Sequence, residues 1–158
     1  MNYKSNIGYR KELLTRLLET IIVHENEIIS ALKADFNKPE FEAVVTETSY
    51  VISDLKHTIK NLSRWAKPKR VFPFVVNIPS SDYIYKEPYG KVLIISPWNY
   101  PFRLLFTPMI GAIAGGNCMV LKPSEFAPAT AAVMAKIIKA LFPENYVLYV
   151  EGEGAQVL

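Results

Sequence analysis

The order of structural elements follows from residues 91–122, which read KVLIISPWNYPFRLLFTPMIGAIAGGNCMVLK. The stretch opens with the continuous apolar run Val92-Leu93-Ile94-Ile95, which is typical of a parallel strand covered on both faces. A helical pattern from about Pro101 to Ala114 follows, and Met119-Val120-Leu121 predicts a second buried strand. Strand, helix and strand in this order predict a βαβ unit.

The pattern continues on the carboxyl side of this unit. Residues 128–141 predict another helix, and residues 146–150 predict a third strand. The expected fold class is therefore α/β, with N-terminal helices followed by half of a doubly wound, Rossmann-like parallel sheet, which is incomplete. Three parts are expected: an N-terminal helical segment (1–70), a projecting edge-strand or oligomerisation segment (71–90), and the truncated first half of a nucleotide-binding domain (91–158).

The N-terminal part has the period of amphipathic helices. Apolar residues at three- and four-residue spacing predict one long helix that Asn37 and Pro39 end, and a second helix that continues as far as Trp65. Three prolines then interrupt short apolar pieces between residues 71 and 90, where Tyr83-Ile84-Tyr85-Lys86 has strand character. Proline confines strands to edges, so this stretch is expected to project from the body or pair along an edge.

Composition excludes several classes of protein. The 158 residues are 50% hydrophobic with a formal net charge of +3, which excludes disorder and does not predict nucleic acid as a partner. The single cysteine, Cys118, excludes an internal disulfide, and no metal site is expected. No secretory signal is visible at the N-terminus, and a cytoplasmic location is expected. The uncharged run at residues 104–121 contains a Gly-Gly-Asn turn, so a buried helix, turn and strand explain it better than a membrane span.

Two loops carry the candidate site residues, because ligands of open α/β sheets bind beyond the carboxyl ends of the strands. In the first loop, the Asn99 amide can donate to a developing oxyanion, but the local pattern favours capping of the helix at Pro101. In the second, Lys122 and Glu125 can bracket a sugar diol, but a solvated ion pair is the simpler interpretation. Cys118 is expected to be a buried, inert thiol, and His24 and His57 have no ligand-like spacing.

The segments Pro97-Trp98-Asn99-Tyr100-Pro101-Phe102 and Leu121-Lys122-Pro123-Ser124-Glu125 resemble the aldehyde dehydrogenase superfamily, most closely its class 3 (fatty or aromatic aldehyde) branch. The resemblance covers the whole chain but only the first third of a family member. It implies an NAD(P)-dependent oxidation of aldehydes to carboxylic acids, carried out by an enzyme that is a homodimer when complete.

The resemblance also assigns roles to single residues. Asn99 matches the asparagine that stabilises the thiohemiacetal oxyanion, and Pro97 and Trp98 match the loop that lines the cofactor. Lys122 and Glu125 match the pair that holds the adenosine ribose hydroxyls, which suits NAD without excluding NADP. The segment 71–90 matches the part that extends toward the oligomerisation strands, and Tyr50 matches an aromatic residue at the substrate entrance.

The departures from the family pattern are equally informative. Cys118 does not match the catalytic cysteine, and neither that cysteine nor the general-base glutamate has a counterpart in these residues. The chain is therefore expected to be inactive alone, and its apolar ending at Val157-Leu158 is expected to be a cut inside an element. The alternatives are a non-catalytic nucleotide-binding or dimerisation module and a membrane-surface protein, against which the acidic residues of the first helix argue.

Overall fold

Three parallel strands carry the apolar runs of the second half of the chain in the computed structural model, which describes residues 6–153. They are β3 (Lys91–Ile95), β4 (Cys118–Lys122) and β5 (Val147–Tyr149), in the spatial order β3-β4-β5. Helix α5 (Pro101–Gly115) connects β3 to β4, and α6 (Pro128–Leu141) connects β4 to β5. The predicted α/β class and Rossmann-like half-sheet are confirmed.

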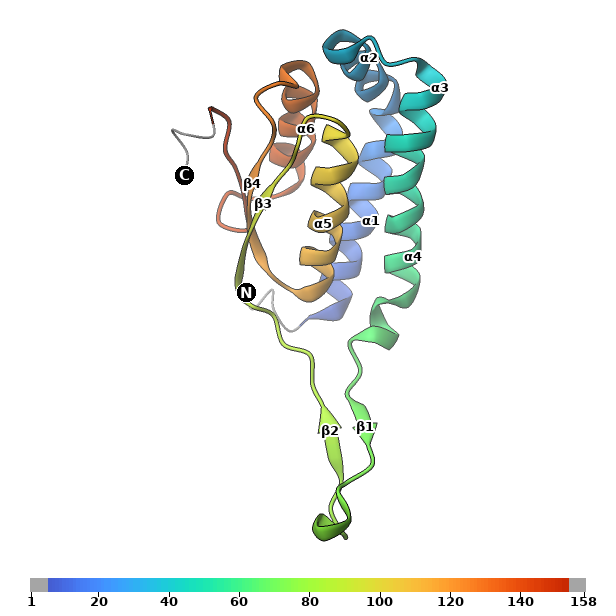
Figure 1. Cartoon of the computed structure of the whole chain (residues 1–158), viewed down its shortest axis with the longest axis vertical. Coiled ribbons are helices and arrows are strands. Elements are labelled where there is room, and N and C mark those ends of the chain that lie inside the picture. Colours follow the sequence, from blue (N-terminus) through green and yellow to red (C-terminus); the bar gives the residue numbers. More distant parts are fainter. Residues whose placement is uncertain (1–5, 154–158) are drawn as a thin grey trace.

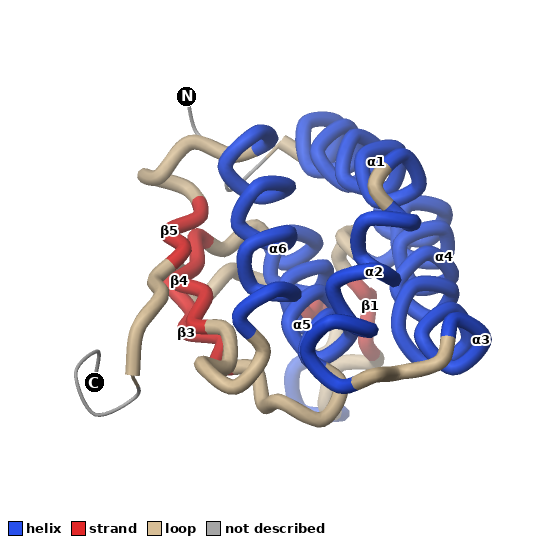
Figure 2. The backbone as a smooth tube through the Cα atoms, turned by 90° about the horizontal axis from the view of Figure 1, so that it is seen from above, coloured by secondary structure: helices blue, strands red, loops and turns tan. Residues whose placement is uncertain are grey.

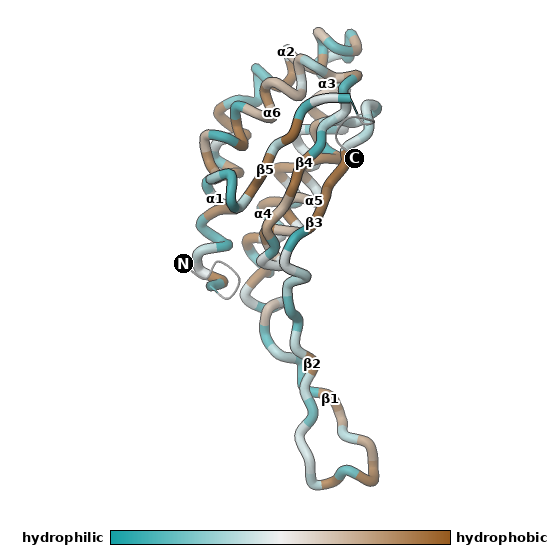
Figure 3. Tube along the Cα trace, turned by 90° about the vertical axis from the view of Figure 1, so that its left-hand side faces the viewer, coloured by the Kyte–Doolittle hydropathy of each residue, from teal (hydrophilic) through white to brown (hydrophobic). Residues whose placement is uncertain are grey.

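The sheet has helices on only one of its two faces within the described residues. Figure 2 shows α5 and α6 on the same side of the strands, and Figure 3 shows the other side of the sheet uncovered. Leu93 and Ile95 are consequently 54% and 53% exposed, so the expectation that this strand is covered on both faces is wrong for these residues. Right-handed crossovers that advance in one direction place their helices on one face, which explains the asymmetry.

The N-terminal helices form a layer that packs against α5 and α6. They are α1 (Ile7–Val23), α2 (Glu25–Phe36), α3 (Glu40–Ala43) and α4 (Ser49–Trp65), with a π-helical turn, η1 (Val44–Thr48), between α3 and α4. Helix α1 packs against α4 and α5, and α2 packs against α6. The core between them contains the fully buried Leu14, Leu17 and Ile21 of α1 and Phe102 and Phe106 of α5.

The predicted first helix is two helices. His24 adopts φ −98° and ψ 10°, which ends α1, and the chain continues as α2 until Asn37 caps it in a left-handed conformation. The end at Asn37 agrees with the prediction, while the break at His24 does not. Because α2 restarts with the same apolar spacing, Ile28 and Leu32 still point into the core and the period conceals the break.

Two short strands, β1 (Lys69–Val71) and β2 (Asp82–Ile84), pair antiparallel and form a hairpin outside the body. Figure 1 shows the hairpin extending well beyond α4 and β3. Its tip, which includes the 3₁₀ turn Val75–Asn77, presents Phe72 and Phe74 at 89% and 73% exposure. The hairpin starts at Lys69, in residues that the sequence assigned to the end of the helical part.

The uncharged run at residues 104–121 is a helix, a turn and a strand, as predicted. Gly116 ends α5 with φ 79°, a left-handed conformation that favours glycine, and the chain enters β4 two residues later. In the described residues, no helix has both the length and the apolar content that crossing a membrane requires. The Val157-Leu158 ending lies outside the described residues.

Candidate functional site

The candidate residues come together at the carboxyl edge of the sheet. Parallel pairing places Ile95, the last residue of β3, opposite Lys122, the last residue of β4. The Ser96 amide donates to the Lys122 carbonyl at 3.0 Å, so the two loops leave the sheet side by side. Pro97, Trp98 and Asn99 therefore lie on one loop and Glu125 on its neighbour, at the edge where such sheets bind ligands.

The first loop is fixed at its ends and exposed in its middle. The buried Ser96 hydroxyl donates to the Pro101 carbonyl at 3.0 Å, which closes the turn into α5. Pro97, Trp98 and Asn99 are exposed, with the Trp98 ring 6.4 Å from the ring of Phe36. Trp98 and Asn99 also line a cavity of about 250 Å³ together with residues 36–39 and Glu42.

The capping interpretation of Asn99 is wrong. The N-cap residue of α5 is Tyr100, whose side chain forms no capping hydrogen bond with the residues that the structure describes. The Arg103 N–H, in the first turn, donates instead to Glu47 at 3.0 Å. The Asn99 amide is therefore not used by the helix and stays at the surface of the loop.

The second loop holds a buried cation. Lys122 is 4% exposed, and its ammonium group forms an ion pair with Glu125, whose side chain is 35% exposed. The solvated interpretation of this pair is consequently wrong for Lys122. A cavity of about 230 Å³ lies beside the pair and is lined by Pro123, Ser124, Glu125, Pro128, Ala131, Glu151 and Gly152. The hydroxyl of Tyr149 donates to the carbonyl of Ala131, a residue of this lining, at 2.8 Å, and burial raises the pKa of this phenol.

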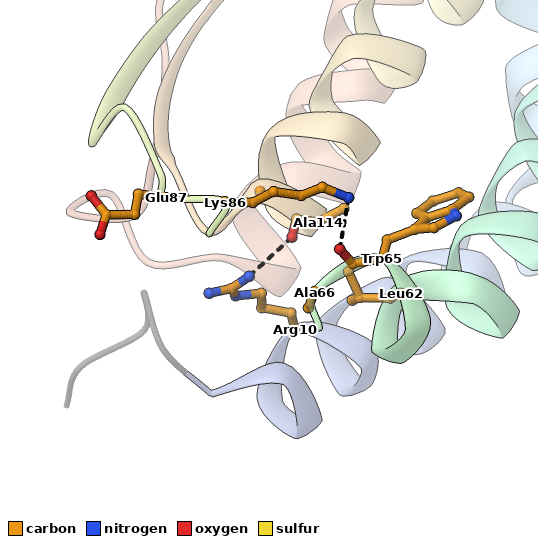
Figure 4. A pocket seen from close by; sticks show the side chains of 8 residues that line it. Arg10, Leu62, Trp65, Ala66, Lys86, Glu87 and Ala114 are labelled. Carbon is orange, nitrogen blue, oxygen red and sulfur yellow. Dashed lines mark hydrogen bonds between the residues drawn. The ribbon is translucent and has the colours of Figure 1, made fainter. Parts of the chain in front are cut away.

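A larger cavity, of about 460 Å³, lies at the opposite end of the sheet (Figure 4). Gly115 and Glu87, which line it, precede β4 and β3 respectively, so the cavity is at the amino ends of these strands. Its two cations bind backbone carbonyls: Arg10 donates to Ala114 at 3.1 Å and Lys86 to Trp65 at 2.8 Å. These groups stabilise the base of the hairpin and the end of α5, and none of the predicted site residues is among them.

The other residues considered from the sequence are not part of the two loops at the carboxyl edge; they are Cys118, His24, His57 and Tyr50. Cys118 is the first residue of β4, as predicted, but it is partly exposed instead of buried. His24 contacts the Thr20 carbonyl at 2.9 Å, and the His57 ring packs 5.4 Å from Trp65. No cluster of three or more potential metal ligands occurs in the part of the chain that the structure describes. Tyr50, 44% exposed, packs its ring 3.6 Å from the Arg103 guanidinium.

Two carboxylates that support the loops were missed by sequence reasoning. Glu47 accepts the Arg103 N–H of α5, and Asp35 accepts the backbone N–H groups of Ala129 and Thr130 of α6, at 2.9 and 2.7 Å. Each helix thus receives its N-terminal cap from the N-terminal layer. The signal in the sequence is indirect: α5 and α6 begin after Tyr100 and Ala127, which are poor capping residues.

The sequence of this chain matches known proteins over most of its length. The sequence profile described as "Aldehyde dehydrogenase family" matches residues 3–158. An aldehyde dehydrogenase of Craterostigma plantagineum is 46% identical over 91% of this chain and 30% of its own length. Family 3 member H1 of Arabidopsis thaliana is 42% identical (88% of this chain, 29% of the relative), and the dog "Aldehyde dehydrogenase, dimeric NADP-preferring" is 41% identical (84% and 29%).

Solved structures agree with this result. A substrate-bound structure of Staphylococcus aureus AldH superposes with a TM-score of 0.92 at 43% identity, over 96% of this chain and 33% of the other. An NAD+ complex of a Bacillus cereus aldehyde dehydrogenase has a TM-score of 0.82 at 27% identity, over 95% and 30%. The chain spans about a third of the length of the proteins it matches.

Proposed function

The chain belongs to the aldehyde dehydrogenase family, and we propose that it supplies the oxyanion-binding and adenosine-binding loops of an NAD-dependent enzyme that oxidises aldehydes to carboxylic acids. The observation that carries this proposal is the adjacency of two loops. The Ser96–Lys122 hydrogen bond joins the loop of Asn99 to the loop of Lys122 and Glu125 at the carboxyl edge of the sheet.

Asn99 is the proposed oxyanion donor. When a thiolate adds to the carbonyl carbon of an aldehyde, the carbonyl oxygen gains a full negative charge and an N–H donor stabilises it. The Asn99 amide is suited to this role because α5 takes its cap from Glu47 and leaves the amide at the loop surface. The two prolines that flank residues 98–100 restrict the loop and thereby favour one position of the amide.

Lys122 and Glu125 are the proposed ribose-binding pair, and their surroundings favour NAD. A nicotinamide cofactor supplies the hydride acceptor of the reaction when it is bound. A carboxylate accepts hydrogen bonds from a ribose diol, and an ammonium donates to one. The cavity beside the pair is lined by both Glu125 and Glu151, and Glu125 already neutralises Lys122. A 2′-phosphate would add negative charge next to two carboxylates, so we infer a preference for NAD over NADP.

The 158-residue polypeptide is proposed to be inactive on its own. Its single cysteine, Cys118, pairs with Lys91 at the amino end of the sheet, whereas Asn99 follows the carboxyl end. The four steps along β4 from Cys118 to Lys122 span about 13 Å of extended strand, so the thiol cannot reach an aldehyde held by Asn99. A non-catalytic nucleotide-binding or dimerisation module remains the second candidate for this polypeptide, and the position of Cys118 is the observation that favours it.

The hairpin is the proposed dimer contact. Its tip exposes Phe72, Phe74, Val75 and Val76 at 73–89%, outside the body of the protein. Contiguous exposed apolar side chains mark interaction sites, and exposed strand edges pair with other chains. The name of the dog relative includes "dimeric", which supports a dimer, while the assignment of the contact to the hairpin rests on its exposed apolar tip.

The test is a hybrid enzyme in which residues 1–158 replace the matching third of Staphylococcus aureus AldH. We expect aldehyde-dependent reduction of NAD that exceeds reduction of NADP, and a loss of about 100-fold in turnover for Asn99→Ala. Asn26→Ala, at an exposed position of α2, is the matched control and should retain full turnover. Unchanged turnover in Asn99→Ala would refute the oxyanion role, and preference for NADP would refute the cofactor assignment.

A further inference from the structure

The loop that carries Asn99 rests on a buried ionic cluster formed by Glu47, Lys38, Tyr100 and Arg103, here called the Glu47 cluster. Glu47 is completely buried and Lys38 is 8% exposed. The Lys38 ammonium donates to Glu47 Oε1 at 2.6 Å, and the Arg103 backbone N–H donates to Glu47 Oε2 at 3.0 Å. Both oxygens of the carboxylate are therefore used, one by a side chain of the N-terminal layer and one by the first turn of α5.

Two further contacts hold the residues on either side of the turn into α5, Tyr100 before it and Arg103 after it. The Lys38 ammonium lies 4.5 Å from the centre of the Tyr100 ring, and Tyr100 directly follows Asn99 in the chain. The guanidinium of Arg103 lies 3.6 Å from the centre of the Tyr50 ring. Both are cation–π contacts, so Tyr100 is held by its ring, and Arg103 is held by its side chain as well as by its backbone N–H. Asn99 is the residue immediately before this fixed segment.

Glu47 lies on an irregular part of the helix. Glu47 lies in η1, the π-helical turn between α3 and α4. Such turns are rare, occur mostly as single turns inside α-helices and are frequent at functional sites. A buried ion pair is weak evidence for stability, because the loss of hydration offsets the attraction between the charges. A buried carboxylate on a π-turn that binds a distant backbone N–H is better explained by what it positions.

We propose that Glu47 is a positioning residue for the Asn99 loop: it fixes the start of α5, and with it the direction of the Asn99 amide. This inference rests on the proposed function for the role of Asn99. It predicts that removal of the Arg103 acceptor loosens residues 98–103 and leaves the rest of the helical body unchanged. It also predicts that removal of this acceptor lowers kcat. The KM for NAD should stay unchanged, because the Lys122–Glu125 loop, which is proposed to bind the cofactor, is separate from the Glu47 cluster.

Two double variants isolate the hydrogen bond from the buried charge. Lys38→Met/Glu47→Leu, here called the leucine double variant, replaces the ion pair by apolar side chains, which buried pairs often tolerate, and removes the acceptor of the Arg103 N–H. Lys38→Met/Glu47→Gln, the glutamine double variant, also removes both charges but retains an acceptor oxygen. Glu40→Gln, at an exposed position of α3 outside the cavity beside Asn99, is the matched control. Both double variants leave no unpaired buried charge, so both are expected to fold.

The measurement is backbone hydrogen exchange of the 158-residue chain, read separately for residues 98–103, α1 and α6. We expect the amides of residues 98–100, 102 and 103 to exchange at least about 10-fold faster in the leucine double variant than in the glutamine double variant, with α1 and α6 unchanged; Pro101 has no N–H. Equal exchange in the two double variants, or acceleration spread evenly over α1 and α6, would overturn the proposal, since it would make Glu47 a general stability residue.

Kinetics of the hybrid enzyme provide the second measurement. The leucine double variant should lose about 10-fold or more in kcat with the KM for NAD unchanged, and the glutamine double variant should recover most of the loss. A rise in KM with kcat unchanged would contradict the positioning role. If Asn99→Ala itself leaves turnover unchanged, the role of Asn99 is wrong, and the exchange data still decide whether Glu47 orders the loop.

Discussion

Replacing Asp35 by alanine should destabilise the chain far more than replacing Glu27, although both carboxylates lie on α2 and both bind α6. Asp35 accepts hydrogen bonds from the N–H groups of Ala129 and Thr130 and from the Thr130 hydroxyl, at 2.9, 2.7 and 2.7 Å. Glu27 instead forms an ion pair with Lys136 at 2.8 Å, where the two side chains are 42% and 58% exposed.

The expected magnitude for Asp35 follows from three contributions. Loss of a capping carboxylate destabilises a helix by about 1 kcal/mol, and loss of a negative charge at the N-terminus adds about 0.5 kcal/mol. The Thr130 hydroxyl is completely buried, so leaving it without a partner adds about 1–2 kcal/mol. The sum is about 3 kcal/mol, a large part of the stability of a typical domain. The Glu27 pair is exposed and screened by solvent, so its removal should have a small effect.

Urea unfolding of the 158-residue chain, followed by far-UV circular dichroism at pH 7, compares three variants with the parent chain. Asp35→Ala should lower the midpoint strongly, Asp35→Asn should lower it less because one acceptor oxygen remains, and Glu27→Ala should be close to the parent. If Asp35→Ala and Glu27→Ala shift the midpoint equally, the cap of α6 is not a major link between the two layers and the reasoning fails.

Three further predictions concern other parts of the chain. Burial raises the pKa of Tyr146 to about 12, so the stability that its neutral phenol contributes is complete below pH 10 and is lost as pH rises from 10 to 12. Urea unfolding at pH 9 and at pH 11.5 measures this loss of unfolding free energy, and Tyr146→Phe should make the loss smaller by about 2 kcal/mol. Asn117→Ala should lower the free energy of unfolding by about 1–2 kcal/mol, since the buried Asn117 side chain accepts the Gly90 N–H at 2.9 Å, and an unchanged midpoint would contradict this. Phe72→Ser/Phe74→Ser should shift the hybrid enzyme from dimer to monomer in sedimentation velocity without changing its circular dichroism, whereas a persistent dimer would exclude the hairpin tip as the main contact.

The elements of the second half were predictable because their determinants are local. The strands β3 and β4 follow from short apolar runs, and α5 and α6 each begin at a proline that suits the first helical position. The pattern could not show which faces these residues cover. Leu93 and Ile95 have the composition of a doubly covered strand, yet coverage depends on where the crossover helices lie in space.

The irregularities of the first half were not predictable from the period. A break at His24 that restores the same apolar spacing leaves no trace in a helical pattern, and neither does the π-turn at Val44–Thr48. The position of the candidate residues was predicted better than their surroundings. The resemblance gave Asn99, Lys122 and Glu125, whereas the burial of Lys122 and the absence of a capping role for Asn99 required the spatial arrangement.

The missing local caps connect the folding of the chain to the construction of its site. Helices α5 and α6 follow the two candidate loops, and neither Tyr100 nor Ala127 caps its helix, so the first turns need acceptors from elsewhere. Glu47 and Asp35 supply them across sequence separations of 56 and 94 residues. Asp35 lies in the last turn of α2, where a negative charge is unfavourable for its own helix. Asp35 stabilises the protein at this position only if its hydrogen bonds to α6 outweigh the unfavourable interaction of its charge with the carboxyl end of α2. The N-terminal layer therefore supplies the caps at which both loops enter their helices. Under the proposal made above, the same layer positions Asn99 through Glu47, a side chain from outside the loop.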